Sequence, residues 1–254
     1  MSPSLLLAVL LAGGLAGVHL FAGRILTATS ISRHHVHSLA GGISVAYVFV
    51  HILPELTEPG ASEHGGGETA SLLHAVGGEH AIFLVTLAGF ASFYGLEQLA
   101  RHSRRTSPRE PARGKEPSGT STGVFWLHVG SFAVYNAIIG YLLLHREEGG
   151  VSSLVLYATA MAVHLVVTDY GLREHHRSAY VHVGRWLLAA SILVGVAIGL
   201  LVGVPSWLLD VTFAFVAGGV ILNVVKEEVP EGSESRFWTF GIGVALYTTV
   251  LLSV

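Results

Sequence analysis

Long apolar segments alternate with short polar ones along the whole chain. A helix that crosses about 30 Å of hydrocarbon needs roughly 20 apolar residues, and eight segments meet that requirement. The pattern predicts an all-α, polytopic membrane protein with eight transmembrane helices in one domain, residues 1–254. The first segment lacks a basic start and a clear cleavage site, so it is predicted to be a span and not a cleaved signal peptide. The predicted spans are residues 4–26, 38–57, 80–100, 123–145, 151–172, 180–203, 206–226 and 237–254.

Composition supports lipid as the solvent. Only 12% of the residues are charged and 51% are hydrophobic, whereas soluble domains carry about 25% charged residues. A net charge of −3 argues against a nucleic-acid partner. The chain has no Cys, which excludes disulfides and thiolate metal sites. Any metal would have to be bound by carboxylates, amides, hydroxyl groups or some of the 15 His residues.

Lys and Arg are distributed unevenly between the predicted loops. Thirteen of the 14 lie in or beside alternate connections, and only Arg146 lies in the opposite set. Because basic loops stay in the cytoplasm, this distribution predicts a multi-pass protein of the cell membrane with both termini extracytoplasmic. The thirteen are Arg24, Arg33, Arg101, Arg104, Arg105, Arg109, Arg113, Lys115, Arg173, Arg177, Arg185, Lys226 and Arg236.

Two predicted loops differ in character. Residues 101–122 are polar, basic and rich in Pro, which predicts a disordered cytoplasmic loop. Residues 58–80 form a Gly-rich extracellular loop that bears His64, His74 and His80 among four Glu residues. That loop is either a solvated connection or a weak collector of divalent cations, since imidazole and carboxylate suit borderline metals.

The second and seventh spans resemble each other. Each contains Ala-Gly-Gly, then a polar cluster, then Pro-Glu, and the second Gly precedes the Pro by 12 positions from Gly42 to Pro54 and by 11 from Gly219 to Pro230. The predicted topology sends these spans in opposite directions, as in transporters built from inverted repeats. Coincidence between two Gly-rich spans is the alternative. The small residues Gly41, Gly42, Gly218 and Gly219 are expected to allow close helix packing.

Ionisable residues at membrane depth are candidates for function. His51 and Glu55 are four positions apart on the second span, a spacing that lets imidazole and carboxylate meet one ion. Pro54 between them removes a backbone donor and is expected to kink the helix. The alternative is a hydrated helix end at the membrane surface.

The fourth and fifth spans carry a second polar group. His164 and Thr168 share a helix face, and Asp169 is displaced by one position. His128 and Asp169 lie at similar depth near the cytoplasmic side, which would allow them to pair. The alternative for each His is an interhelical hydrogen bond, worth about 0.6–2 kcal/mol in membranes. Tyr135 and Asn136 lie on the fourth span, nearer the middle.

Charged residues at the ends of two further spans need no special function. Glu97 closes the third span, and Lys226 with the two residues after it closes the seventh. They are expected at the cytoplasmic interface, where long side chains reach water and pair.

The segments SLAGGISVAYVFVHILPE and FVAGGVILNVVKEEVPE resemble the second and seventh helices of the ZIP family of divalent-metal transporters. The resemblance implies an eight-helix bundle with an inverted repeat in a three-plus-two-plus-three arrangement. It also implies movement of Zn²⁺, or of Fe²⁺ or Mn²⁺, toward the cytosol, with the metal as transported substrate and no organic cofactor. The expected partners are the lipid bilayer, divalent metal ions and, as one option, a second copy in a homodimer.

The fourth and fifth spans depart from the family pattern. Tyr135 stands where the family usually has His, Ile139 where it has an acid, and Leu165 where it has Glu, so a binuclear centre is not expected. The remaining candidate ligands of a single metal site are His164, Asp169, Asn136, Thr168 and Tyr135, with His51 and Glu55 at the mouth.

Two alternatives to transport stay open. One is a ZIP-fold protein with a degenerate site that acts as a sensor, partner or structural protein without transport. The other is an intramembrane metal- or haem-dependent enzyme, for which His19, His128, His164 and His182 are available. The sequence contains no His-Glu-x-x-His spacing, so the chain is not expected to be an enzyme.

Overall fold

The computed structural model describes residues 3–28, 33–57, 80–106, 122–145, 150–228 and 237–253. All regular secondary structure within these ranges is helical, as the apolar pattern predicts. The elements are α1 (Pro3–Ala28), α2 (Arg33–Tyr47), η1 (Val48–Ile52), α3 (Leu53–Thr57), α5 (Ala81–Thr106), α6 (Thr122–Leu142), α7 (Val151–Ala179), η4 (Tyr180–Gly184), α8 (Arg185–Leu201), α9 (Ser206–Glu228) and α10 (Phe237–Leu251).

Seven helical segments of the described chain are long and apolar enough to cross a membrane. They correspond to the first seven predicted spans, and the shorter apolar helix α10, with 15 residues, occupies the place of the eighth. Large apolar side chains such as Leu10, Leu87 and Val194 are about half exposed, which suits contact with lipid. The fold is that of a multi-pass membrane protein.

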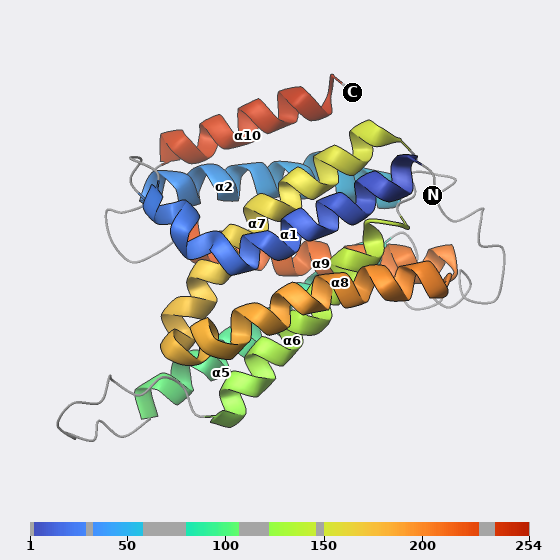
Figure 1. Ribbon diagram of the computed structural model, residues 1–254. Coiled ribbons are helices and arrows are strands. Elements are labelled where there is room, and N and C mark those ends of the chain that lie inside the picture. The colour runs from blue at the N-terminus through green and yellow to red at the C-terminus, as the bar shows by residue number, and fades with distance from the viewer. Residues whose placement is uncertain are drawn as a thin grey trace.

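Helix ends differ from the predictions in two places. α5 continues to Thr106, so the start of the predicted loop 101–122 is helical, and residues 107–121 lie outside the described chain. Between the fifth and sixth spans the prediction placed a loop, but α7 continues to Ala179 and passes through the π-helical turn η4 into α8 (Figure 1). Of the predicted loop 58–80, only His80 is described.

A π-helical turn lies just before Pro54, where the sequence predicts a kink in the helix. Pro54 has no N–H and therefore cannot donate to the helix ladder. One residue earlier, the Leu53 N–H donates to the Val48 carbonyl five residues back, and this closes η1 between α2 and α3. Such single π turns often lie at functional positions because they shift the side chains that follow them.

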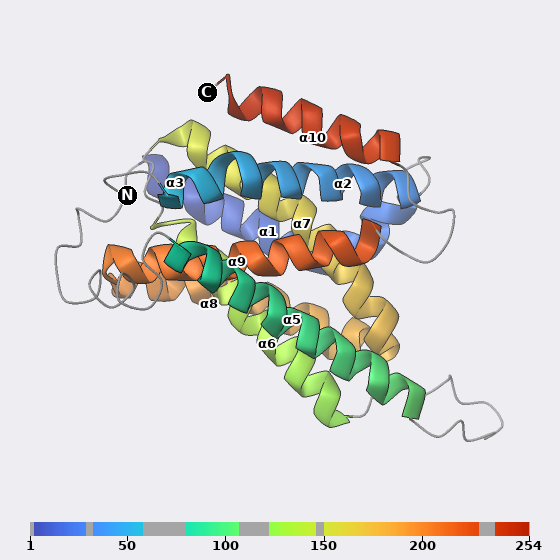
Figure 2. The same ribbon diagram turned by 180° about the vertical axis from the view of Figure 1, so that it is seen from behind.

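Helices pack in pairs that recur through the bundle. α2 lies along α10, α5 along α9 and α6 along α8, while α1 packs on both α7 and α8. Figures 1 and 2 show α2 and α10 as one layer, with α5 and α6 running obliquely across the other side of the bundle. The start of α1 and the end of α10 point toward the same side of the molecule (Figure 1).

Glycines allow the closest of these approaches. A Cβ at Gly42 would overlap the Phe240 carbonyl oxygen on α10, and a Cβ at Gly218 would overlap the Thr86 carbonyl oxygen on α5. The predicted role of Gly42 and Gly218 as close-packing residues is confirmed.

Candidate functional site

The centre of the bundle holds a group of four polar side chains from three helices. They are Tyr135 on α6, His164 and Thr168 on α7, and Asn223 on α9, and each is at most 3% exposed. His164 Nε2 lies 3.2 Å from Tyr135 Oη and 3.3 Å from Thr168 Oγ1. Asn223 Nδ2 donates to Thr168 Oγ1 at 3.3 Å. The structure therefore brings together three of the predicted site residues and adds Asn223.

Helix geometry explains the pair on α7. Residues four apart lie one turn apart on the same face, so the Thr168 hydroxyl reaches both the His164 imidazole and the His164 carbonyl, the latter at 3.1 Å. His164 Nδ1 is buried and has no hydrogen-bond partner within the described chain. Buried polar atoms are nearly always hydrogen-bonded, so this nitrogen is available to a ligand or to water.

Asp169 does not join this group. It lies one position after Thr168 and turns toward α1, where His19 Nδ1 is 2.7 Å from its Oδ1. The Tyr180 hydroxyl donates to the same oxygen. Asp169 does not pair with His128, although the sequence places the two residues at similar depth. His128 Nδ1 instead lies 2.9 Å from His176 Nε2.

Asn136 is fully buried on α6, and neither atom of its amide has a hydrogen-bond partner in the described part of the chain. The remaining two predicted residues, His51 and Glu55, lie at one end of the bundle, 3.8 Å apart from Nε2 to Oε2. They are 18% and 24% exposed, so their site is partly open. The two side chains share a helix face, as their i,i+4 spacing predicts, and their binding of an ion stays a prediction.

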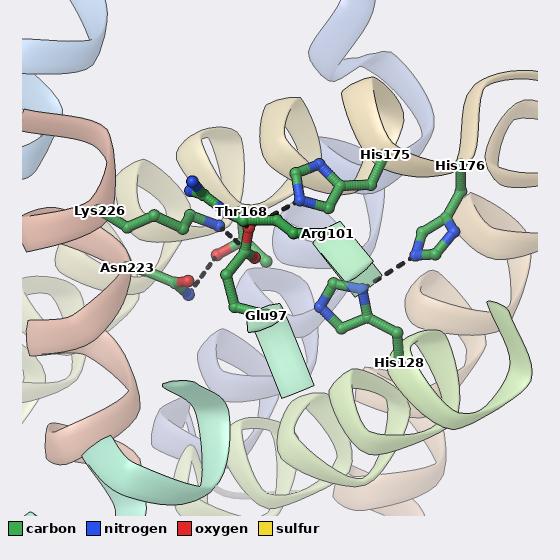
Figure 3. Close-up of polar contacts among 8 residues, drawn as sticks. All are labelled: Glu97, Arg101, His128, Thr168, His175, His176, Asn223 and Lys226. Atoms are coloured by element: carbon green, nitrogen blue, oxygen red, sulfur yellow. Dashed lines mark hydrogen bonds and ion pairs between the residues drawn. The ribbon is translucent and has the colours of Figure 1, made fainter. Parts of the chain in front are cut away.

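A charged cluster surrounds the carboxylate of Glu97 (Figure 3). Glu97 on α5 is only 5% exposed, so it is buried and not merely interfacial as the sequence suggested. Its carboxylate accepts from Lys226 Nζ at 3.1 Å and from Arg101 Nε at 2.8 Å, and it lies 2.7 Å from His175 Nε2. Glu97 thereby links α5, α7 and α9.

These groups follow one another along the bundle as separate polar clusters. From the His51–Glu55 end, ring contacts lead from His51 to Tyr47 at 5.1 Å and from Tyr47 to Tyr157 at 6.2 Å. Tyr157 Oη donates at 3.1 Å to the Ile139 carbonyl, one helical turn beyond Tyr135. We use "polar file" for the members His51, Glu55, Tyr47, Tyr157, Tyr135, His164, Thr168, Asn223, Lys226, Glu97 and His175.

Helix α7 contributes more residues to the polar file than any other helix. It contributes Tyr157, His164, Thr168 and His175, which are spaced by 7, 4 and 7 residues and therefore lie on one face. Eighteen residues of helix span about 27 Å, close to the thickness of the hydrocarbon layer. The file is thus long enough to cross most of a bilayer.

The α7 spacing was a signal that the sequence offered and that the predicted site did not use. Tyr157, His175 and Asn223 were not among the candidate residues, although Tyr157 and His175 share the 7-4-7 pattern with His164 and Thr168. Asn223 had no comparable signal, because a lone Asn in an apolar span does not reveal which helix it faces.

The described chain contains no group of three or more His, Asp or Glu side chains placed to hold a metal ion. The central group instead offers one imidazole, a phenol, an aliphatic hydroxyl and an amide. No protein-family model matches the chain, and no curated protein or solved structure matches it either. Its function is therefore inferred from its own residues.

Proposed function

We propose that this protein is a membrane carrier of a divalent cation, with Zn²⁺ as the first candidate and Fe²⁺ or Mn²⁺ as alternatives, moved toward the cytosol. The observation that carries the proposal is the polar file, which runs inside a bundle of apolar helices. Polar and ionisable residues buried at membrane depth are costly and mark ion pathways in membrane proteins. The members of the polar file come from the second, third, fourth, fifth and seventh spans.

The chemistry of the file suits an ion that passes and is released. The end at His51 and Glu55 supplies imidazole and carboxylate, which attract a divalent cation. The centre at His164 supplies one strong ligand and neutral oxygens, so it would hold the ion weakly. Transport requires binding that is favourable enough to admit the ion and weak enough to let it leave.

The helix packing supports an inverted repeat in a three-plus-two-plus-three arrangement. The repeat equates the first three spans, α1, α2 and α5, with the last three, α8, α9 and α10. In this repeat α1 corresponds to α8, α2 to α9 and α5 to α10, so the contact of α2 with α10 corresponds to the contact of α9 with α5. If α6 also corresponds to α7, the contact of α1 with α7 corresponds to the contact of α8 with α6. Both contacts of each corresponding pair occur in this bundle, as expected when two inverted halves enclose a midplane site.

Uptake into liposomes tests the proposal. Purified protein is reconstituted around a Zn²⁺-sensitive dye, and the initial rate is measured after addition of external Zn²⁺. His164→Asn should lower the rate at least about tenfold, which is the smallest loss common when a contact supporting a metal site is removed. His182→Asn is the matched control because that imidazole is exposed, and it should leave the rate unchanged. Equal rates for the wild type and His164→Asn would overturn the proposal.

Asp169→Asn tests the carboxylate of the fifth span separately. Its oxygen is engaged by His19 and Tyr180 and not by His164. A fall in rate as large as that of His164→Asn would assign Asp169 to the transport site, and an unchanged rate would restrict that site to the central group.

The second candidate is a ZIP-like protein without transport, acting as a metal sensor, a partner or a structural subunit. The specific observation in its favour is that the described residues offer no three-ligand metal group. It predicts that Zn²⁺ uptake equals that of empty liposomes. A rise in unfolding temperature with millimolar Zn²⁺ in the same preparation would indicate a sensor, since a ligand that binds only the folded state stabilises it.

A further inference from the structure

A pocket of about 810 Å³ lies where α1, α7, η4 and the start of α8 meet. None of its lining residues belongs to the polar file, so the proposed transport function does not use it. Its volume is within the range of about 300–1,000 Å³ that is usual for small-molecule sites. We refer to it as the basic pocket, after the lining residues Arg24, Arg173 and Arg185.

Guanidinium groups outnumber carboxylates in the basic pocket. Its carboxylates are Glu174, which is exposed, and Asp169, whose Oδ1 is already bound by Tyr180 and His19. Arg185 Nε is buried and has no hydrogen-bond partner among the residues that the structure describes. His19 is 2% exposed, and within the same described residues its Nε2 also has no partner. The buried Arg185 Nε–H is the donor among these atoms, and beside three guanidinium groups it favours an anionic ligand.

The local backbone makes room for one of these arginines. A Cβ at Gly23 would overlap Nη1 of Arg173, so the guanidinium of α7 lies directly against α1 at a position that has no side chain. The Arg185 guanidinium lies over the Trp186 ring at 5.4 Å from its centroid, which fixes its plane. Planar, oriented guanidinium groups bind phosphate oxygens through two parallel hydrogen bonds.

The surroundings of the basic pocket indicate where its ligand comes from. The lining side chains Phe21 and Trp186 are 49% and 53% exposed, on helices that can span a membrane. Aromatic side chains of this kind gather at the level of lipid headgroups. This end of α1 and α7 carries basic residues and is predicted to be cytoplasmic, the side on which acidic lipids concentrate.

We propose that the basic pocket binds the phosphate headgroup of an anionic membrane lipid. The arginines would hold the phosphate, while the acyl chains leave past Phe21 and Trp186 into the bilayer. A soluble phosphate compound shares the headgroup chemistry but gains nothing from the apolar mouth, so the lipid is the expected occupant.

Native mass spectrometry in detergent tests the proposal with phosphatidylglycerol as the probe and phosphatidylcholine as the zwitterionic comparison. The wild type should retain one phosphatidylglycerol in preference to phosphatidylcholine. Arg24→Gln with Arg173→Gln removes two of the three guanidinium groups and should weaken binding at least about tenfold, the lower end of the cost of losing one hydrogen bond to a charged group. Both side chains are exposed, so their replacement should not disturb folding, which unfolding in the absence of lipid checks.

Arg101→Gln is the matched control. It removes one positive charge, as each substitution of the double variant does, from the same end of the bundle, where Arg101 shares Glu97 with His175, but it lies outside the basic pocket. Lipid retention should be unchanged in this variant. Equal weakening by Arg101→Gln and by the double variant would reduce the effect to general surface charge and overturn the proposal. Binding of glycerol 3-phosphate with no preference for phosphatidylglycerol would also overturn it.

Discussion

Position 169 illustrates how one residue of displacement decides which helix a carboxylate meets. Successive helical residues are turned by about 100°, so Thr168 faces α9 and Asn223 while Asp169 faces α1 and His19. The same rotation separates two kinds of chemistry on α7. One face carries the neutral groups of the polar file, and the next carries a carboxylate that lines the basic pocket.

Glu97 is the residue whose replacement should cost most stability. Its carboxylate is 6% exposed and is shared by Lys226, Arg101 and His175. Glu97→Gln would remove the carboxylate charge that Lys226 Nζ, on a side chain 13% exposed, contacts at 3.1 Å. We expect a loss of roughly 3 kcal/mol, the lower end of the range for breaking a buried pair.

Thermal unfolding in detergent measures this loss. Glu174→Gln is the control, since that carboxylate is exposed on α7, and it should change the unfolding temperature little. A similar small change for both variants would show that Glu97 makes no net contribution to stability.

At the residue scale, contacts within one helix were easier to predict from the sequence than contacts between helices. The i,i+4 pairs His51–Glu55 and His164–Thr168 were predictable because both members lie on one helix. Contacts between helices, such as that of Asp169 with His19, depend on the rotation and tilt of each helix in the bundle. Periodicity alone carries no information on those quantities in a chain whose helices are apolar on most faces.

Among the helices, three reciprocal glycine pairs mark close packing: Gly140 of α6 with Gly195 of α8, and the two pairs described next. Gly42 of α2 approaches the backbone of α10, and Gly243 of α10 approaches the Leu39 carbonyl of α2. On the other side, Gly218 of α9 approaches α5, and Gly89 of α5 approaches the Phe215 carbonyl of α9. Each pair brings two helix backbones into contact, where dispersion and weak hydrogen bonds replace the hydrophobic effect that is absent in lipid.

Substitution of these glycines should separate the helices. Gly42→Ala and Gly218→Ala would each place a methyl group on a backbone carbonyl, and we expect a loss of about 1–3 kcal/mol from overpacking. Gly14→Ala is the matched control, because a Cβ there meets nothing within 4 Å. Unfolding temperatures in detergent measure all three variants, and a loss for Gly14→Ala equal to the others would contradict the packing explanation.

In the whole molecule, the apolar pattern was sufficient to predict an all-helical multi-pass protein. The lengths of the first seven spans follow from hydropathy because lipid permits no other backbone arrangement for apolar segments of this kind. The continuous helical path from α7 through η4 into α8 was not predicted. Polar residues such as Arg173, which is exposed on α7, suggested a loop there.

The predicted orientation can be tested with single cysteines, since the chain has none of its own. Ser4→Cys at the start of α1 and Ser253→Cys after α10 are both at exposed positions. A membrane-impermeant maleimide should label both in intact cells, because the basic loops place the termini outside. His102→Cys, exposed near the end of α5, should react only after permeabilisation. The reverse pattern would invert the topology and the proposed direction of transport.

The contacts of Glu97 have a consequence for the speed of any passage through the polar file. One carboxylate ties α5, α7 and α9 together, so an ion that leaves at this end must displace Lys226 and His175 in the same step. Breaking these charge contacts would add to the activation enthalpy of such a step. The rate of ion transport through the polar file should therefore rise steeply with temperature. At low temperature the contacts of Glu97 would slow the release of the ion.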